Sequence, residues 1–379
     1  MEYRECTKLL FDTHDDPNMT FDENGVCNYY HEYLQLEKDY VKYGEAGEKE
    51  VAEIVAYAKA NKKGKYDCLI GVSGGVDSTY LLYLAKTKLG LNPLAIHFDN
   101  GWNSELAVKN IESVTQKLDI DLQTYVIDWE EFKDIQRSYF EAGVVDLEVP
   151  TDHAIYGAMY STAIDNGIKV ILSGVNIVSE SIMPHHWSYE KMDYANLMDI
   201  HKRFGTVKIK NYPVVDKAFQ DKIKKADIKI LRLLNYVPYV KKDVEDILIN
   251  ELGWKPYGGK HYESIFTRFY QGYILPRKFG INKRRAHLSN LICSGQLTKE
   301  EAKAILAVPD YSEEMQKEDK EYVLKKLNFT EAYFDAYMQK KEVPHKYYLH
   351  THSSLYQKYP VLLPLRPLGL MVKKVLRIE

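Results

Sequence analysis

The sequence predicts an α/β fold, a doubly wound parallel sheet with a small N-terminal segment and a mostly helical C-terminal region. Apolar, β-like runs alternate with amphipathic, helix-like runs between about residues 65 and 180. A glycine-rich turn follows the first apolar run, and polar side chains follow each of the others. This alternation is typical of parallel strands joined by crossover helices, with ligands bound beyond the carboxyl ends of the strands.

The predicted elements follow one another in order along the chain. Residues 48–64 form a helix, because Val51, Ile54 and Ala58 share one apolar face and Gly64 is placed to end it. The elements after it are predicted strands at 66–72, 92–101, 121–129 and 168–176 and predicted helices at 77–88, 103–119 and 151–167, with Asn103 and Thr151 or Asp152 as N-caps.

The bulk composition indicates a globular chain long enough for two or three domains, with 379 residues, 45% of them apolar and 28% charged. The formal net charge of −3 argues against a protein built mainly to bind nucleic acid, although a local basic patch stays open. No apolar run approaches the ~20 residues that cross a bilayer, and no signal peptide is visible. We therefore expect a cytoplasmic protein with neither a membrane nor a nucleic acid as its partner.

Three regions are predicted along the chain. Residues 1–46 are expected to be irregular, 47–215 to hold the sheet, and 216–379 to form a mostly helical region that contacts the substrate or a partner. The four cysteines show no disulfide framework. Cys68 and Cys293 both lie in apolar surroundings and are expected to be buried.

The hexad Ser73-Gly74-Gly75-Val76-Asp77-Ser78 lies between the first strand and its helix. Two glycines let the backbone turn tightly and direct N–H groups into one concavity, and the start of the helix adds its positive end. Phosphate fits such a site. Asp77 belongs there only if a cation bridges it to the phosphates, and Mg²⁺ is the natural choice. The alternative is an ordinary glycine-rich turn, which the full hexad argues against.

The sequence does not match two other phosphate-binding motifs. The chain has no G-x-G-x-x-G. The nearest approach to G-x-x-x-x-G-K-[ST] lies at residues 253–260, but it has an extra glycine, is followed by His261, and does not follow a strand-like run.

The hexad resembles the PP-loop of the ATP pyrophosphatase superfamily, whose members transfer AMP to a substrate oxygen and release pyrophosphate. The resemblance implies ATP and Mg²⁺ as cofactors, with Asp77 and Glu180 as the metal ligands. The nucleotide contacts that it implies are Val72, Ser73, Gly74, Gly75, Val76, Asp77, Ser78, His97, Asp99, Asn100, Gly174 and Asn176. Glu180 taken alone can also be an ordinary solvated carboxylate.

Four stretches resemble the N-acetyl sugar amidotransferase family: the hexad, residues 19–30, residues 173–181 and, most specifically, residues 251–302. This family is associated with bacterial surface polysaccharide and glycan biosynthesis. The resemblance implies that an N-acetylated sugar is adenylated on its acetamido oxygen, and that ammonia then replaces AMP to give an acetamidino sugar. A nucleotide-linked sugar and a sialic-acid-like sugar are both open as the substrate.

Basic and polar residues in the second half of the chain are candidates for this chemistry. Asp77, Lys260 and Lys283 are the predicted catalytic residues, and Arg284 is expected to help neutralise pyrophosphate, although residues 283–285 can also be a solvated helix start. A histidine or glutamate beside the sugar could deprotonate ammonium. The predicted sugar contacts are His153, Tyr156, His261, Glu263, Arg268 and Gln271.

The source of ammonia and the N-terminal cysteines complete the prediction. No cysteine has the setting of a glutaminase nucleophile, so a separate glutaminase subunit is the expected partner. Relatives in this family often carry paired C-x-x-C zinc motifs near the N-terminus, but here only Cys6 and Cys27 remain of them. His14 and His31 could complete a zinc site, yet zinc is not expected, and packing by Leu9 and Tyr30 is the preferred interpretation.

Three other functions are weighed. A tRNA-thiolating enzyme needs a catalytic cysteine pair or an iron–sulfur site and a basic face, which this chain lacks. A nucleotide-binding scaffold without activity conflicts with the intact Asp77 and Glu180. A different amidating synthetase, such as an NAD synthetase, is disfavoured by residues 251–302.

Overall fold

The computed structural model describes residues 2–353 and contains a five-stranded sheet in the order β3-β2-β1-β4-β5, with every pairing parallel. The predicted α/β class with a parallel sheet is confirmed. The strands are β1 (Cys68–Gly71), β2 (Pro93–Asp99), β3 (Leu122–Val126), β4 (Val170–Leu172) and β5 (Lys229–Leu231).

The fifth strand was not predicted. β5 has only three residues and lies where the sequence indicates mostly helix, so it carries too little pattern to be recognised. It belongs to the sheet because Ile230 pairs with Ile171 of β4.

The helices predicted between the strands are present, with shifted ends. An unpredicted helix, α5, lies between β3 and α6, and a π-helical turn at Leu84–Lys88 extends α3. The helices of the sheet region are α2 (Gly44–Ala60), α3 (Val76–Tyr83), α4 (Glu105–Lys117), α5 (Trp129–Ala142) and α6 (Val149–Asp165).

Two predicted helix caps are wrong. Ser104, not Asn103, caps α4, because its side chain accepts a hydrogen bond from the backbone N–H of Ala107. Helix α6 begins at Val149, ahead of Thr151 and Asp152, with Pro150 in its first turn. Proline is favoured there because it lacks the N–H that the first turn leaves unpaired.

The two faces of the sheet have separate hydrophobic cores. Ile70 of β1 packs with Ile54 of α2, Leu81 of α3 and Ile111 of α4 on one face. On the other face Leu69 packs with residues of α6, among them Ala158. Burial of neighbouring residues on opposite faces explains why these strands are almost wholly apolar in sequence.

A third and larger core lies beyond the carboxyl ends of the strands. It joins the N-terminal segment, α1, α5 and the C-terminal helices, and it includes Phe11, Trp102, Phe140 and Phe266. This core crosses the boundaries of the three predicted regions, whose division stays a prediction. Residues 354–379 of the third region lie outside the described residues.

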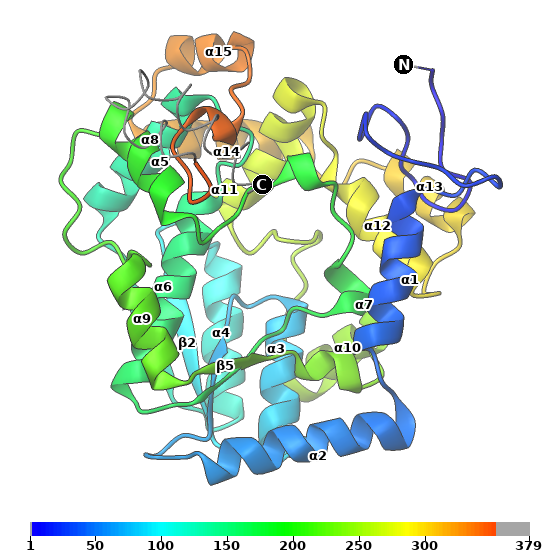
Figure 1. Ribbon diagram of the computed structural model, residues 1–379, viewed down its shortest axis with the longest axis vertical. Coiled ribbons are helices and arrows are strands. Elements are labelled where there is room, and N and C mark those ends of the chain that lie inside the picture. The colour runs from blue at the N-terminus through cyan, green and yellow to red at the C-terminus, as the bar shows by residue number, and fades with distance from the viewer. Residues whose placement is uncertain (1, 354–379) are drawn as a thin grey trace, which may run out of the picture.

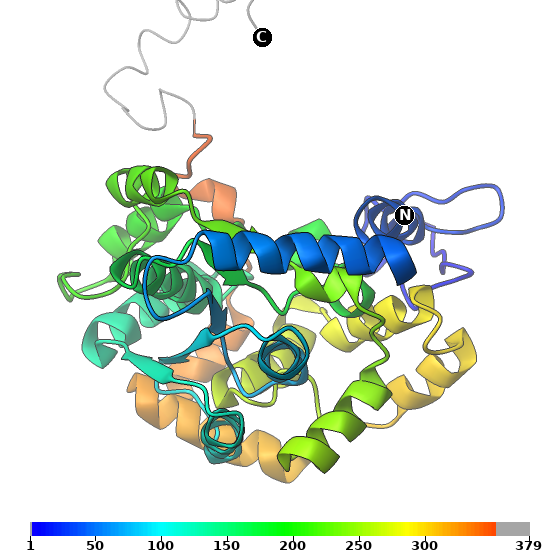
Figure 2. The ribbon, with the colours of Figure 1, turned by 90° about the horizontal axis from the view of Figure 1, so that it is seen from below.

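The remaining helices lie around the sheet and the third core. In Figure 1, α5, α8, α11, α14 and α15 lie at the end of the molecule opposite α2. Figures 1 and 2 both show α1 (dark blue) on the same side as α12 and α13 (yellow). These helices are α1 (Asn28–Tyr40), α7 (Ile177–Glu180), α8 (Tyr194–Phe204), α9 (Lys217–Ala226), α10 (Lys241–Ile247), α11 (Ile265–Phe269), α12 (Lys283–Cys293), α13 (Lys299–Ala307), α14 (Glu313–Leu327) and α15 (Glu331–Gln339). The shorter helical segments are Leu248–Leu252 and Tyr270–Phe279, both π-helical, and His185–Trp187, Leu233–Tyr236 and His345–Tyr347, all 3₁₀.

The N-terminal segment is more ordered than predicted, because α1 occupies 13 of its residues. The Sγ atom of Cys6 accepts hydrogen bonds from the N–H groups of Cys27 and Leu9 at 3.2 and 3.4 Å. Leu9 is fully buried, and Tyr30 packs against the same core.

The two histidines considered beside those cysteines have other surroundings. His31 pairs with Asp22, and the His14 side chain is 81% exposed. Of the other two cysteines, Cys68 is fully buried as predicted, while Cys293 is only partly buried. No helix within residues 2–353 has both the length and the apolar character required to span a membrane.

Candidate active site

The predicted phosphate loop connects β1 to the first turn of α3. Gly74 has a φ of +83°, and a Cβ atom there would lie 2.8 Å from the backbone oxygen of Ala107, so only glycine fits. The N–H of Gly75 donates to Ser73 Oγ, and no side chain caps α3. The first turn of α3 therefore keeps backbone donors that can bind an anion.

Asp77 lies in the first turn of α3 and is the acidic group of this loop. Its Oδ1 accepts hydrogen bonds from the Tyr239 hydroxyl and, at 3.4 Å, from Asn176 Nδ2. Burial raises the pKa of Asp77; Lys260 opposes this rise and the charge of Glu180 adds to it. Two carboxylates that repel each other in one site suit a bound cation, so Asp77 and Glu180 fit Mg²⁺.

The segment after β4 supports the phosphate loop from the side. A Cβ atom on Gly174 would lie 3.2 Å from the backbone nitrogen of Ser78, so the two turns are in close contact. Asn176 is buried, and its side-chain oxygen caps α7 by accepting a hydrogen bond from Ser179 N at 2.9 Å. Asn176 therefore contacts the site through the hydrogen bond that it donates to Asp77.

One cavity of about 710 Å³ extends from the phosphate loop to the C-terminal helices. Its size and mixed polar and apolar lining are those of a small-molecule site. The predicted site residues that line it are Ser73, Gly75, Val76, Asp77, Ser78, Gly174, Glu180, Lys260, His261, Glu263, Arg268, Gln271, Lys283 and Arg284.

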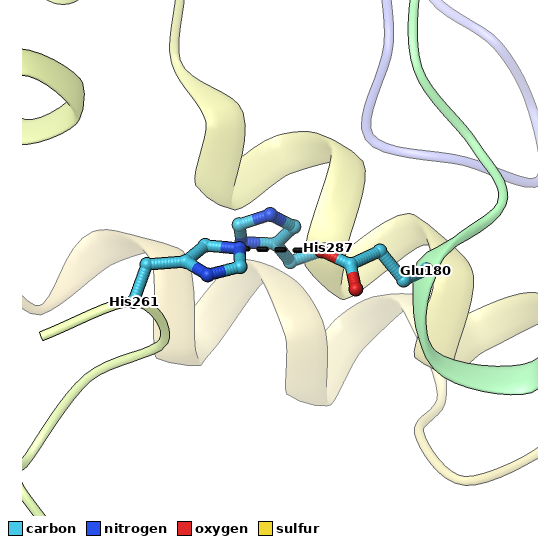
Figure 3. A group of neighbouring side chains, drawn as sticks. All are labelled: Glu180, His261 and His287. Carbon is cyan, nitrogen blue, oxygen red and sulfur yellow. Dashed lines mark ion pairs between the residues drawn. The ribbon is translucent and has the colours of Figure 1, made fainter. Parts of the chain in front are cut away.

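Glu180 is the centre of a charged cluster in this cavity. Its Oε1 lies 3.5 Å from Lys260 Nζ and 3.2 Å from His261 Nε2. Burial by itself raises the pKa of Glu180. The neighbouring Lys260, His261 and His287 outweigh burial and lower this pKa well below its usual range. Figure 3 shows the Glu180 carboxylate with the imidazoles of His261 and His287 directed toward it.

The two imidazoles of the cluster differ in their protonation. Burial lowers the pKa of His261, but its bonds to Glu180 and Glu263 outweigh this and raise the value to about 9. Burial, together with the charges of Lys260 and His261, holds the pKa of His287 well below its usual range. At neutral pH the cluster therefore pairs a charged His261 with a neutral His287.

A loop at residues 254–264 brings Lys260, His261 and Glu263 to the phosphate loop. Trp254 Nε1 donates to the backbone oxygen of Gly74 at 2.8 Å, and Ser104 N donates to the backbone oxygen of Glu263 at 2.8 Å. His261 has a φ of +64°, which is strained for a residue with a side chain. Strain of this kind persists where the surrounding contacts fix the backbone, and it is common at functional sites.

The far end of the cavity carries its own ion pairs. Lys283 Nζ lies 3.6 Å from Glu148 Oε2, which also accepts a hydrogen bond from Gln271. Arg284 pairs with Asp310 at 3.0 Å. Residues 283–293 are helical, so the predicted helix start at Lys283 is present. The side chain of Lys283 lies in the cavity rather than in solvent.

Arg268 does not have a free guanidinium for a substrate. Its Nε and Nη2 atoms each donate to the carboxylate of the buried Asp319 at 2.7 Å. Because the guanidinium of Arg268 already binds both oxygens of this carboxylate, the side chain serves to hold α11 to α14 at the cavity wall.

Several predicted residues lie outside the cavity lining. His153 is fully buried, with Nδ1 2.9 Å from the backbone oxygen of Lys191 and Nε2 accepting from Val215 N at 2.9 Å. Its helix begins earlier than predicted and directs that residue into the core, and Tyr156 likewise is not among the lining residues. Neither residue lines the cavity, and their role as sugar contacts stays a prediction.

The predicted nucleotide contacts at the end of β2 and directly after it do not line the cavity. His97 Nδ1 lies 3.2 Å from the backbone oxygen of Val72. Asp99 and Asn100 accept hydrogen bonds from the N–H groups of Gly101 and Trp102. The other predicted nucleotide contacts outside the lining are Val72, Gly74 and Asn176.

Sequence reasoning missed three polar residues of the cavity. Tyr239 follows β5 and bonds Asp77, and Tyr257 has a buried hydroxyl without a partner in the structure. His287 completes the cluster around Glu180. Its position four residues after Lys283, on the same helix face, was a signal that could have found it.

Two families of known proteins match separate parts of the chain, and both parts contribute residues to this cavity. Residues 50–149 match the family described as NAD synthase, and residues 263–360 match the family described as LPS biosynthesis protein WbpG-like, C-terminal domain. Together with the phosphate loop, these matches support the prediction that the chain is a member of the PP-loop ATP pyrophosphatase superfamily. The first match is to a domain of NAD synthases, and the second is to a domain described from lipopolysaccharide biosynthesis proteins.

Two further proteins are similar to parts of the chain. An uncharacterized protein of Methanocaldococcus jannaschii, MJ1599, is 27% identical over 281 residues, which cover 71% of this chain and 82% of that protein. The structure of NMN synthetase from Francisella tularensis aligns with 60% of this chain and 93% of its own at 14% identity and a TM-score of 0.29.

Proposed function

We propose that the protein is an ATP-dependent amidotransferase that converts the acetamido group of an N-acetylated sugar into an acetamidino group. The acetamido oxygen attacks the α-phosphorus of ATP, and pyrophosphate leaves. Ammonia then attacks the activated carbon, and AMP departs with the former amide oxygen. The sugar would belong to bacterial surface polysaccharide or glycan biosynthesis, in the cytoplasm.

One observation carries this proposal: the two family-matched segments line the same cavity. Ser73–Ser78 belong to the NAD synthase match, and Gln271 and Lys283 belong to the WbpG-like match. A triphosphate on the loop would therefore have its α-phosphorus near a second ligand held by the C-terminal half. Holding two reactants in one orientation supplies much of the rate of such a transfer.

The residues present suggest how the first step is assisted. The N–H groups of the loop and the first turn of α3 would bind the β- and γ-phosphates, and Lys260 would neutralise charge that develops on pyrophosphate. Mg²⁺ held by Asp77 and Glu180 would supply further charge neutralisation. Tyr239, through its hydroxyl donated to Asp77, would orient that carboxylate.

Ammonia requires a source and a base. We propose a separate glutaminase subunit as the source. An unprotonated group in the cavity must accept a proton when ammonium is the form supplied, and Glu263 and His287 both line that cavity.

The burial of Cys68 disfavours the alternative of a tRNA-thiolating enzyme. Its side chain is fully buried in β1, and burial raises the pKa of the thiol well above its ordinary value. A buried neutral thiol is not a sulfur carrier. A scaffold without activity remains as the second alternative, and the assay below separates it from an enzyme.

The test is mass spectrometry of reactions that contain the protein, ATP, Mg²⁺, ammonium and a panel of N-acetylated sugars. Conversion of an acetamido to an acetamidino group replaces O by NH and lowers the mass by about one unit, and AMP and pyrophosphate should form in equal amounts. Asp77→Asn should abolish both signals, and Asp39→Asn, an exposed substitution on α1, should change neither. Formation of ADP and orthophosphate, or full turnover by Asp77→Asn, would refute the proposal.

A further inference from the structure

Glu180, His261 and His287 bring three potential metal-ligand atoms within 4.8 Å of one another. Among the described residues, 2–353, these three side chains form the one group with metal-ligand spacing. The three residues come from α7, the 254–264 loop and α12, and their side chains point toward a common centre (Figure 3). We propose that this cluster binds a divalent transition metal of the zinc or cobalt type through one oxygen of Glu180, which leaves the second oxygen of that carboxylate to the Mg²⁺ that accompanies ATP.

The donor set selects the class of metal. Two imidazoles and one carboxylate are ligands that zinc, cobalt, iron and nickel prefer, whereas Mg²⁺ takes oxygen ligands and keeps several waters. The Nε2 atom of His261 and the Oε1 atom of Glu180 are already 3.2 Å apart, which suits two ligands on one tetrahedral ion. The third ligand atom, a ring nitrogen of His287, lies within 4.8 Å of both.

A second carboxylate orients one of the imidazoles. His261 Nδ1 lies 3.8 Å from Glu263 Oε1, on the opposite side of the ring from Glu180. Metal-bound histidines commonly donate their other N–H to a carboxylate, which fixes the ring and strengthens the ligand. Glu263 is therefore in the place of such an orienting group.

Acidic and basic side chains both surround the cluster. Asp77 and Glu263 line the cavity with Glu180, and Lys260 Nζ lies 3.5 Å from Glu180 Oε1. A metal between Glu180 and the imidazoles would release Lys260 from Glu180 and leave its charge available to a phosphate. Three protein ligands leave a coordination position open, and the ligand residues line the cavity, as in catalytic rather than structural metal sites.

The experiment is a titration of the metal-free full-length protein with Co²⁺, without ATP or sugar, followed by visible d–d absorption. We expect one Co²⁺ per chain and no thiolate-to-cobalt charge-transfer band. His261→Gln, His287→Gln and Glu180→Gln should each weaken binding by more than about tenfold, and Glu263→Gln by about tenfold. An excess of Mg²⁺ should not displace the Co²⁺. Because no substrate is present, failure here is distinguishable from failure of the proposed function.

Two controls identify the site. His14→Gln, whose side chain is exposed outside the cavity, should bind Co²⁺ as the unchanged protein does. Cys27→Ser should also have no effect, which separates the cluster from the Cys6 and Cys27 thiols. Circular dichroism checks that each variant folds, and Co²⁺ should raise the melting temperature of the unchanged protein but not that of His287→Gln. Absence of d–d bands, unchanged affinity in a folded His287→Gln, or a thiolate band lost in Cys27→Ser would overturn the proposal.

Discussion

The Nε2 atom of His261 lies 3.2 Å from the Oε1 atom of Glu180, and this contact joins two segments that are far apart in the sequence. Glu180 ends α7, just after β4, whereas His261 lies on the loop before α11. The contact fixes the 254–264 loop over the phosphate loop, so the C-terminal half of the chain closes the cavity that the sheet begins. Three of the predictions below test this cavity and its walls, and the fourth tests a buried histidine elsewhere in the fold.

Gly74→Ala should weaken ATP binding by about tenfold and destabilise the fold by ~1–2 kcal/mol, because a left-handed backbone disfavours a side chain. The new Cβ would also meet the backbone oxygen of Ala107 at 2.8 Å, so the loop must shift. Gly280 is the matched control, since its φ is +69° but nothing lies within 4 Å of its Cβ position. Gly280→Ala should cost less stability, because only the left-handed backbone opposes it, and should leave ATP affinity unchanged, as calorimetry and urea unfolding will measure. Equal ATP affinity in the two variants would contradict the loop's role.

Lys260→Met and Lys283→Met should have different kinetic effects, although both lysines line the cavity. Lys260 acts on Asp77 and Glu180, so its loss should lower kcat for pyrophosphate release by ~100-fold. Lys283 pairs with Glu148 beside Gln271, so its loss should mainly raise KM for the sugar. Steady-state kinetics with each substrate varied in turn will separate the two. The assignment fails if both variants change only KM for ATP.

Arg268→Leu should destabilise the protein by ~3 kcal/mol, because it leaves the buried Asp319 carboxylate without its bidentate partner. The double variant Arg268→Leu with Asp319→Leu should recover much of that loss, because no unpaired charge remains. Urea unfolding of the two single variants and the double variant gives the coupling energy. Additive effects would show that the pair does not hold α11 against α14.

The stability of the protein should fall as the pH is lowered from about 6.5 to about 4, in part because of His345. Burial lowers the pKa of this histidine from 6.5 to about 4, and its ring stacks on Tyr189 while Nδ1 lies 3.0 Å from Asn196 Oδ1. The unfolded chain binds a proton in this interval and the folded chain does not, so stability is present above pH 6.5 and is lost as the pH falls. The contribution of His345 amounts to at most ~3 kcal/mol.

Urea unfolding of the unchanged protein and of His345→Gln at several pH values will test this. The difference in unfolding free energy between the two should shrink from pH 7 to pH 4.5, because glutamine does not titrate. Parallel curves for the two proteins would show that His345 does not contribute.

The phosphate loop and the strands around it could be predicted from the sequence because their signals are local. Six consecutive residues specify the turn, and the apolar runs of β1 and β2 are long enough to show burial on both faces. The three-residue β5 lacked such a signal, and the cap of α6 is Glu148, three or four residues before the predicted Thr151 or Asp152, which is the usual error for a helix end. The placement of His153 could not be predicted, because a polar residue on a helix can face either a cavity or a buried backbone.

What the sequence determined by itself is the glycine-rich loop after β1 and the alternating pattern that makes a parallel sheet, since both depend on neighbours in the chain. What only the tertiary structure decided is which side chains from distant segments meet. It brought Tyr239 to Asp77, His287 to Glu180 and Asp319 to Arg268. The reason is physical: these contacts form only when the hydrophobic cores have packed the C-terminal half of the chain against the sheet and beyond the ends of its strands, and no local pattern encodes that packing.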